Sequence, residues 1–237
     1  MRILLTNDDG VNSPGIRALF DELSGEHDVT IVAPMRTQNA SSHSLTLRNP
    51  LKIKKISKKI IGVYGTPTDC VILAIYNLLD DLPELLLSGV NLGPNLGDDV
   101  TYSGTVGAAI EGAIIGIPSV SLSFYEPENP DFKAAIMFIL KLIKIIEKNK
   151  RIFSDMLLNV NIPHSPRGVR ITKLGRREYE NVVEEGKRGY LIGGDRKELI
   201  EAGTDFEACK KGYISVTPLL TDLTHYEAIK ALKSWKF

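Results

Sequence analysis

Hydrophobic residues in the first part of the chain fall into short runs separated by amphipathic stretches. Residues 2–6 (RILLT) and 28–34 (DVTIVAP) are short apolar runs, typical of strands buried on both faces. Between them, Ser13 and Pro14 predict the start of a helix, because serine caps helices and proline is favoured at the first helical position. We expect this helix to end near Leu23. A strand, a helix and a strand in this order predict a βαβ unit with a parallel sheet and a right-handed crossover.

The same alternation continues along the chain as far as residue 149. We expect helices from Thr66-Pro67 to about Leu79, at about 105–116 and at 131–149, and buried strands at 83–90 and 118–124. Residues 45–64 hold short β-like pieces in which lysines alternate with isoleucines, which indicates one solvated face. The helix at 131–149 has an apolar stripe at helical spacing, which we interpret as core, and a lysine face, which we interpret as solvated. The stripe is Ile136, Ile139, Leu140, Ile143 and Ile146, and the lysines are Lys141, Lys144 and Lys148.

The pattern changes in the last third of the chain. Residues 156–163 (MLLNVNIP) end the alternating region, and residues 169–217 indicate β-ribbons and charged loops without regular alternation of strand and helix. An amphipathic segment begins at about His225. The pattern predicts an α/β fold with a parallel sheet, formed by residues 1–150 or so, and an accessory C-terminal arm that is not an independent domain.

Composition narrows the functional classes. The chain has 43% hydrophobic and 24% charged residues, and its 29 Lys and Arg balance 29 Asp and Glu. No net field therefore favours a nucleic acid polymer or an anionic membrane as partner. The apolar stretch at 105–124 contains Glu111 and Pro118, so a buried helix, a turn and a strand explain it better than a membrane span. With no signal-peptide pattern, and with Cys70 and Cys209 expected to be reduced, we expect a soluble, cytoplasmic protein.

Three polar loops follow the first three predicted strands of the sheet. They are residues 6–15 (TNDDGVNSPG), 36–44 (RTQNASSHS) and 89–99 (GVNLGPNLGDD). Ligands of open parallel sheets bind at the carboxyl ends of the strands, so topology places the three loops on one rim. Asp8 and Asp9 stand side by side in the first loop, and a cation between them would offset their repulsion.

The oxygen-rich loops limit the choice of cation. They offer carboxylate, amide and hydroxyl oxygens, whereas the four histidines (27, 43, 164 and 225) are scattered and show no zinc-like spacing. Hard oxygen ligands suit Mg²⁺, Mn²⁺ or Ca²⁺. A second acidic pair, Asp98 and Asp99, fits a solvated loop equally well.

A segment after the third loop favours phosphate. In residues 102–112 (YSGTVGAAIEG), Ser103, Gly104 and Thr105 begin a helix, whose free amides and positive dipole end suit an anion. The segment lacks the lysine of a P-loop. A phosphate site that faces a hard divalent cation indicates phosphoryl chemistry.

Four segments together resemble the signature blocks of the SurE survival-protein family. They are residues 1–15, 65–70 (GTPTDC), 88–112 and 203–219 (GTDFEACKKGYISVTPL). The resemblance spans nearly the whole chain. It implies a metal-dependent 5′(3′)-nucleotidase that acts on nucleoside monophosphates, with some activity on short polyphosphate. It also implies one Rossmann-like, three-layer domain over residues 1–237, in which residues from about 151 add a completing strand and a β-rich arm used in homodimers or homotetramers.

The resemblance also assigns candidate ligands for one Mg²⁺ or Mn²⁺ per subunit. The family's metal ligands carry over onto Asp8, Asp9 and Asn95. The fourth is usually a serine in the loop after the second strand, and ungapped alignment places Asn39 there. An amide oxygen is also a good hard ligand, and the neighbouring Ser41 and Ser42 stay open as alternatives.

The expected reaction is in-line attack of water on a phosphomonoester bound to the cation, which stabilises the charge that develops on the phosphoryl oxygens. Ser103, Gly104 and Thr105 would hold the phosphate. Either Asp8 or Asp9 could orient or deprotonate the water, and we favour Asp8. Asn12 and His43 lie in the same loops and could contact the phosphate or the leaving group.

Other classes fit the sequence less well. A haloacid-dehalogenase-type phosphatase needs an Asp-x-Asp nucleophile pattern, but here Gly10 and Val11 follow the aspartates. A signalling receiver domain needs an aspartate after its third strand, which the run LLLSGVN lacks. A nucleotide-binding regulatory protein without catalysis, or a general acid phosphatase without nucleotide preference, stay as alternatives.

Overall fold

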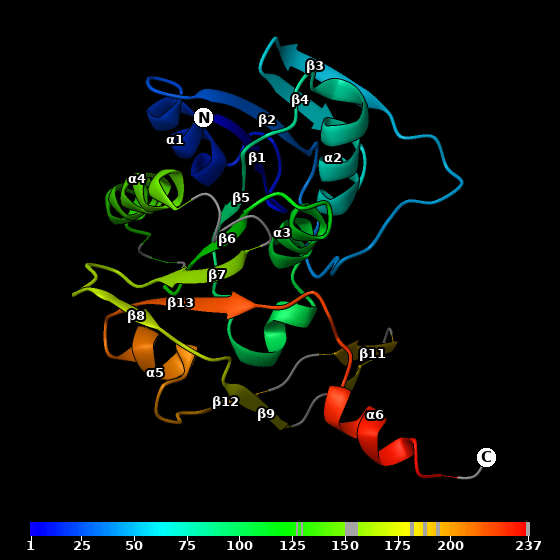
Figure 1. Ribbon diagram of the computed structural model, residues 1–237, viewed down its shortest axis with the longest axis vertical. Coiled ribbons are helices and arrows are strands. Elements are labelled where there is room, and N and C mark those ends of the chain that lie inside the picture. Colours follow the sequence, from blue (N-terminus) through cyan, green and yellow to red (C-terminus); the bar gives the residue numbers. More distant parts are fainter. Residues whose placement is uncertain are drawn as a thin grey trace.

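The computed structural model describes residues 1–126, 128, 130–149, 156–180, 183–186, 189–192 and 195–235. A central sheet runs through the molecule with helices on both faces (Figure 1). Its strands are β1 (Arg2–Thr6), β2 (Asp28–Pro34), β3 (Ile53–Ser57), β4 (Ile60–Val63), β5 (Leu85–Asn91), β6 (Ser119–Phe124), β7 (Leu157–Ile162), β8 (Val169–Ile171) and β13 (Ile214–Leu219). The α-helices are α1 (Pro14–Leu23), α2 (Pro67–Leu73), α3 (Gly104–Ile114), α4 (Phe132–Lys148), α5 (Asp205–Lys210) and α6 (Tyr226–Leu232).

The main sheet is mixed but mostly parallel, which confirms the predicted α/β class. Its strand order is β3-β4-β2-β1-β5-β6-β7-β13-β8. The strands from β4 to β7 in this order pair in parallel, whereas β3 and β13 pair antiparallel with β4 and β7. The chain moves outward from β1 through β2 to β4 and then returns to β5 on the other side of β1. This reversal makes the β1/β5 junction the switch point, where a ligand crevice is expected.

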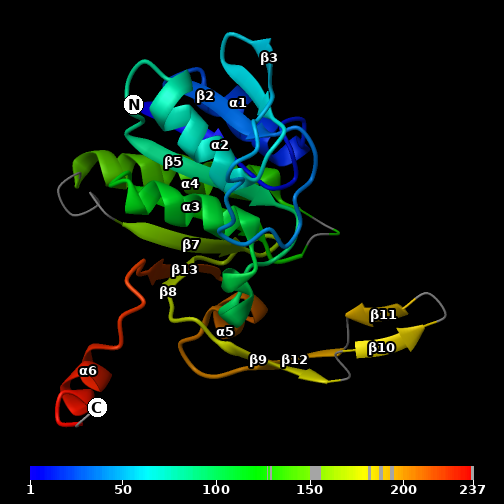
Figure 2. The same cartoon turned by 90° about the vertical axis from the view of Figure 1, so that its right-hand side faces the viewer.

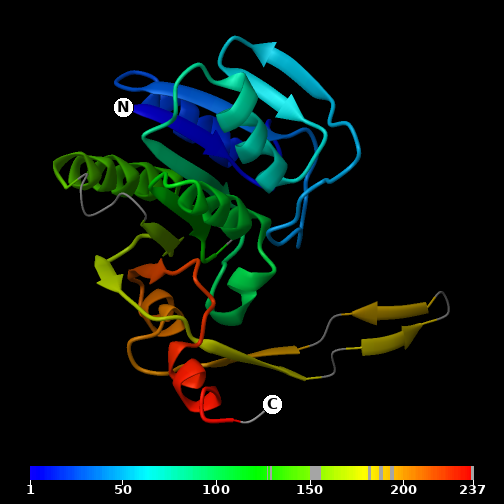
Figure 3. The ribbon, with the colours of Figure 1, turned by 45° about the vertical axis from the view of Figure 1, so that its right-hand side comes forward.

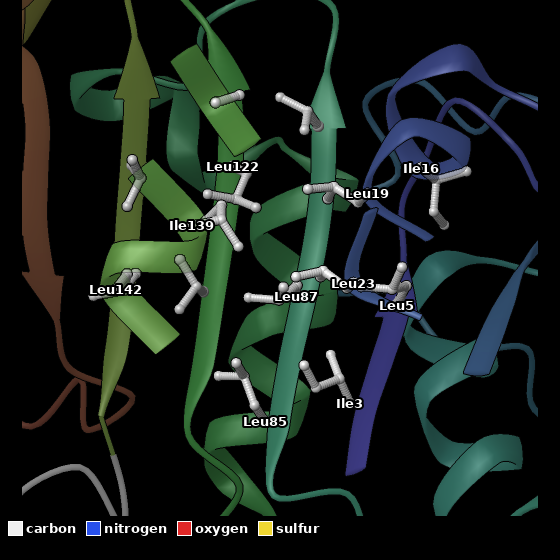
Figure 4. Packing of buried hydrophobic residues seen from close by; sticks show 14 of the residues in the cluster. Ile3, Leu5, Ile16, Leu19, Leu23, Leu85, Leu87, Leu122, Ile139 and Leu142 are labelled. Atoms are coloured by element: carbon white, nitrogen blue, oxygen red, sulfur yellow. The ribbon is translucent and has the colours of Figure 1, made fainter. Parts of the chain in front are cut away.

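Two apolar layers sandwich the sheet. One lies under α1 and α4 and the other under α2 and α3. Figure 1 shows these two pairs of helices on opposite sides of the sheet. Figure 4 shows the first layer, in which Leu5 of β1 lies beside Leu23 of α1 and Leu122 of β6 lies beside Ile139 of α4. Leu4 belongs to the opposite layer, because successive side chains of a strand point to opposite faces. Full burial of one such side chain contributes about 1.5–3 kcal/mol.

Most of the expected elements of the core form. The βαβ unit is confirmed, with α1 between β1 and β2. The helix expected to reach Leu79 is shorter as an α-helix, because α2 passes into a π-helical turn, η1 (Ala74–Leu78). In the lysine-rich segment, β3 and β4 form, but residues 45–47 form no strand. The stripe of α4 is confirmed, since Ile139, Ile143 and Ile146 are buried and the other two members pack against the same cluster.

The C-terminal part contains the predicted ribbons and one helix that the sequence pattern did not reveal. Strands β9 (Arg176–Glu180) and β12 (Asp195–Leu199) pair, as do β10 (Val183–Gly186) and β11 (Gly189–Ile192). Together they form an arm that extends away from the body (Figures 2 and 3). Helix α5 precedes β13 in a region where only ribbons and loops were expected. Helix α6 matches the expected amphipathic segment but buries none of its residues.

No helix in the described ranges combines the length and apolar character that crossing a bilayer requires.

Candidate metal and phosphate site

The three polar loops meet at the switch point, as the sequence predicts. They leave the carboxyl ends of β1, β2 and β5, which lie side by side and run parallel. The amide of Gln38 donates to the carbonyl of Asp8 at 2.8 Å, and the amide of Leu92 donates to Oδ2 of Asp9 at 3.4 Å. The first loop therefore contacts each of the other two.

Asn7 fixes the shape of the first loop, and the sequence reasoning missed it. Its buried side chain donates to the carbonyl of Gly10 at 3.0 Å and to Oγ of Ser13 at 2.7 Å, and it accepts from the Gly10 amide at 3.1 Å. Gly10 has φ +106°, a conformation that glycine adopts without strain. Ser13 occupies the cap position of α1, but its side chain makes no capping hydrogen bond and serves Asn7 instead. These contacts fix the loop on both sides of Asp8 and Asp9, at Asn7 and at Gly10.

Asp8 is buried and tied to α3. Its side chain accepts from Oγ1 of Thr105 at 2.6 Å and from the amide of Thr105 at 3.2 Å. Burial raises the pKa of Asp8, and the charge of Asp9 raises it further, while the hydrogen bonds from Thr105 oppose both effects. Asp8 is thus held in a fixed position, and a nearby cation would stabilise its ionised form.

Asp9 faces a pocket. Burial also raises the pKa of this half-buried carboxyl group. The pocket measures about 380 Å³, and its lining includes Asn12 and Arg36. The amide oxygen of Asn12 accepts from Arg17 at 2.8 Å. The sequence reasoning did not single out Arg36, although its position two residues after β2 places a positive charge on the rim.

The loop after β2 offers Asn39, Ser41 and Ser42 as alternative ligands, and the structure places them differently. Oγ of Ser42 donates to the carbonyl of Thr101 at 2.6 Å. Oγ of Ser41 is buried and has no hydrogen-bond partner among the described residues. A Cβ added to Gly104 would clash with this hydroxyl and would lie 3.2 Å from Oδ2 of Asp8. Ser41 and Asp8 therefore border the same small space, whereas Asn39 is exposed.

Asn95 lies over the ends of β6 and β7. Its amide nitrogen donates to Oγ of Ser123 at 2.7 Å, and its backbone amide donates to Asn161 at 2.9 Å. The side chains of Asn159 and Asn161 donate to its carbonyl. The side-chain oxygen, which is the atom a hard cation binds, receives no hydrogen bond from the described part of the chain. No hydrogen bond between Asn95 and Asp8 or Asp9 is present there either.

The start of α3 borders Asp8, and its three predicted phosphate ligands differ in their contacts. Oγ of Ser103 caps the helix by accepting from the amide of Val106 at 3.1 Å, which leaves its proton to donate. The amide of Gly104 has no acceptor within the described residues. Thr105 is committed to Asp8 through both its amide and its hydroxyl, so in this structure it positions the carboxylate.

His43 is paired with a residue that the sequence reasoning did not connect to the site. Its Nε2 lies 2.6 Å from Oε2 of Glu111, on α3. The side chain of Glu111 is only 12% exposed and that of His43 is 32% exposed. This contact attaches the loop after β2 to α3. The sequence offers no signal for it, because the two residues are 68 positions apart.

The second acidic pair has a structural partner. Asp99 forms an ion pair with Arg177, at the base of the arm, and Oδ2 of Asp98 accepts from the amide of Arg177 at 3.4 Å. Both aspartates lie in a short 3₁₀ helix, η2 (Gly97–Thr101), directly before α3. This pair therefore connects the loop to the arm.

The donors on the rim fit a hard divalent cation. In the parts of the chain that are described, no group of three or more His, Cys, Asp or Glu could hold a metal. The candidate set has two carboxylates, Asp8 and Asp9, so amide and hydroxyl oxygens would have to complete it. The unpartnered, buried hydroxyl of Ser41 beside Asp8 is the observation that supports this fit.

Comparison with known proteins assigns the family. The family model described as Survival protein SurE matches residues 3–181. The chain belongs to the SurE family. It is 42% identical to the 5′-nucleotidase SurE of Geobacter metallireducens, over 100% of this chain and 98% of that protein. It is 44% identical to the 5′-nucleotidase SurE of Nitrosomonas eutropha, over 99% of each chain.

A solved structure agrees with the fold of this SurE-family chain. The crystal structure of the SurE protein from Aquifex aeolicus superposes with a TM-score of 0.88 at 41% identity, covering 98% of both chains. The expected Rossmann-like α/β architecture with a C-terminal extension is thereby confirmed.

Proposed function

We propose that this SurE-family protein is a metal-dependent phosphomonoesterase that hydrolyses nucleoside 5′-monophosphates to nucleosides and phosphate. Two relatives that match over nearly their full lengths are named 5′-nucleotidases. The observation in the structure that carries the proposal is the approach of Asp8 to the start of α3, through Thr105. It brings a candidate cation ligand and a candidate phosphate site together. Nucleoside 3′-monophosphates and short polyphosphate are further substrates for the same assay.

Mg²⁺ or Mn²⁺ is the cofactor that suits these donors. We assign Asp8, Asp9 and Asn95 as ligands, with either Ser41 or Asn39 as the fourth. Between the last two, the lack of a partner for the buried hydroxyl of Ser41 favours Ser41. When bound, the cation would polarise the phosphoryl oxygens and stabilise the charge that develops on them.

The chain's own groups would bind the phosphate and handle the proton. The amide of Gly104 and the hydroxyl of Ser103 donate to phosphate oxygens at the positive end of the α3 dipole. Asp8, held by Thr105, orients the attacking water and accepts its proton. The pair of His43 and Glu111 keeps the loop after β2 against α3, and we assign His43 a contact with the phosphate or the leaving group.

A second pocket next to that of Asp9 suits the nucleoside. It measures about 400 Å³, and Met35 and Arg36 line both pockets. Tyr64 lies on its wall with 50% of its surface exposed. An exposed aromatic ring offers a stacking surface for any base. The adjacent pockets therefore leave room for a nucleoside beside the candidate ligand Asp9.

Phosphate release by metal-stripped protein, with and without Mn²⁺ or Mg²⁺, tests the proposal. AMP, GMP and an aryl phosphate are compared as substrates. Metal-dependent turnover that favours the nucleotides is the expected result. Turnover of the aryl phosphate alone would keep the phosphatase chemistry and refute the nucleotidase assignment. Nucleotide binding without turnover under either metal would instead identify a regulatory protein.

We further propose that the C-terminal arm joins subunits into a homodimer or homotetramer within a single-domain protein. Leu191 and Ile192 on the arm are 66% and 81% exposed, and Leu223, shortly before α6, is 94% exposed. Large apolar side chains at such exposure are typical of surfaces that another chain covers. Light scattering during size-exclusion chromatography measures the mass, and a monomer would refute this assignment.

We also propose a cytoplasmic location. Cys70 and Cys209 are both buried, and the chain has no other cysteine. So few cysteines are typical of proteins kept in a reducing compartment, where disulfides are rare. Fractionation of cells with an antibody against the protein checks this.

A further inference from the structure

A basic pocket lies outside the candidate active site. It measures about 450 Å³ and is formed by the loop after β7 and the turn after α5. The residues on its wall are His164, Ser165, Arg167, Arg170, Lys210, Lys211, Gly212 and Tyr213. The amide of Arg167 donates to the carbonyl of Gly212 at 2.8 Å, so backbone contacts hold the two segments together. No candidate metal or phosphate ligand lines this pocket.

The positive charge of the pocket is a local concentration. The whole chain has 29 basic and 29 acidic residues, so a general excess of base does not explain it. Glu207 offsets part of the charge, through Lys211 at 2.5 Å and more weakly through Arg170. Glu126 nearby accepts from the backbone amide of His164. Within the described residues, no carboxylate forms an ion pair with Arg167, Arg170 or Lys210.

Helix stabilisation explains only some of these charges. Lys210 is in the last turn of α5, where a cation favours the helix dipole by about 0.3–1 kcal/mol. Arg167 and Arg170 come from the other segment and do not belong to a helix. Two arginines thus converge on the pocket, and among the described residues neither forms an ion pair with a carboxylate, although Glu207 interacts weakly with Arg170.

The side chains of the pocket suit phosphate groups better than a base. The guanidinium of Arg170 lies 3.9 Å from the centre of the Tyr213 ring and covers one of its faces, which leaves less of the ring for a base. Arginine binds phosphate through paired hydrogen bonds. The volume falls in the range of about 300–1,000 Å³ found for small-molecule sites. The positive charges of Arg167, Arg170 and Lys210, which form no ion pair among the described residues, together exceed the charge of one phosphate. We propose that this pocket binds a small anion that carries two or more linked phosphate groups.

Calorimetric titration of the metal-stripped, full-length protein with tripolyphosphate tests the proposal, with orthophosphate as the comparison. We expect saturable binding of one tripolyphosphate per chain, about 10-fold or more tighter than orthophosphate. The double variant Arg167→Gln/Arg170→Gln should weaken binding about 10-fold or more. Its turnover of AMP with Mn²⁺ should stay unchanged, because the candidate active site lies elsewhere.

A second double variant controls for the loss of two positive charges. Lys141→Gln/Lys144→Gln removes the same charge from the exposed face of α4 and should leave binding unchanged. Arg167→Gln alone, at an exposed position, serves as a second variant if loss of the Arg170–Tyr213 contact unfolds the double variant. Absence of saturable binding to wild type, equal weakening in the α4 pair, or full binding in the folded arginine variants would each overturn the proposal. None of these outcomes depends on the protein being a nucleotidase.

Discussion

The rim at the β1/β5 switch point and the C-terminal arm use side chains in opposite ways. At the β1/β5 switch point, polar groups are buried and paired, as Asn7, Asp8 and Thr105 illustrate. On the arm and α6, apolar groups are exposed, as Ile192 and Leu223 illustrate. Buried polar groups are costly unless partners hold them, so they mark a preorganised site. Exposed apolar groups are unfavourable in water, and we propose that another chain covers those of the arm.

Asp8→Asn should have the largest effect of the changes at the switch point. It removes one negative charge from the candidate metal ligands and the proposed proton acceptor, so kcat with AMP should fall about 10³-fold or more. Saturating Mn²⁺ should raise the Tm of wild type but not of the variant, because a ligand stabilises only the state that binds it. Asp21→Asn, on the exposed side of α1, is the matched control and should keep full activity. Full activity of Asp8→Asn would refute the site.

Leu122→Ala tests the apolar layer between the sheet and helices α1 and α4. Leu122 on β6 is fully buried in the α1/α4 layer (Figure 4). Truncation should lower the free energy of unfolding by about 2–5 kcal/mol, since it leaves a cavity. Denaturant titration measures this. Leu223→Ala removes the same atoms from a side chain that is 94% exposed and should change the stability of the subunit by less than about 0.5 kcal/mol.

Ser41→Ala distinguishes the candidates for the fourth ligand. If the unpaired hydroxyl of Ser41 binds the cation, its loss should weaken Mn²⁺ binding about 10- to 100-fold. Ser42→Ala should have a smaller effect, because that hydroxyl already donates to Thr101. Calorimetric titration with Mn²⁺ provides the affinities. A loss seen only in Asn39→Ala would assign the role to Asn39, as alignment with the family suggests.

Removal of residues 220–237 should have the smallest effect on the stability of the subunit. Helix α6 buries none of its residues, so the Tm of the remaining chain should stay within a few degrees of wild type. If this segment contributes to subunit contacts, the mass measured by light scattering should fall. A large loss of Tm at unchanged mass would show that α6 belongs to the body of the subunit.

The sequence predicted the rim well because topology alone brings its loops together. The apolar runs identified β1, β2 and β5, and parallel strands necessarily end at one edge. Asp8 and Asp9 stood out because adjacent carboxylates repel each other, and a cation between them would offset the repulsion. The same reasoning could not find side-chain partners that are distant in sequence. The contact of Thr105 with Asp8 spans 97 positions, and only the packed structure brings them together.

The C-terminal part was less predictable for a related reason. Helix α5 has only six residues, too few for a periodic pattern to emerge. Its place is fixed by Asp205, whose carboxylate accepts from the amides of Gly97 and Gly175 at 2.8 Å each. Gly97 begins η2 and Gly175 precedes the arm. Such long-range anchoring leaves no local signal in the sequence.

Asp205 also connects the two parts of the chain that the pattern of elements separates. The carboxylate of Asp205 accepts from the amide of Gly97 in the turn before α3, and Arg177 forms an ion pair with Asp99 in the same turn. A minimal version cut near residue 150 would keep Asp8, Asp9 and Ser103. It would nevertheless lose the groups that hold the turn leading into Ser103. The half of the chain that holds the candidate ligands therefore depends on contacts from the half that holds none of them.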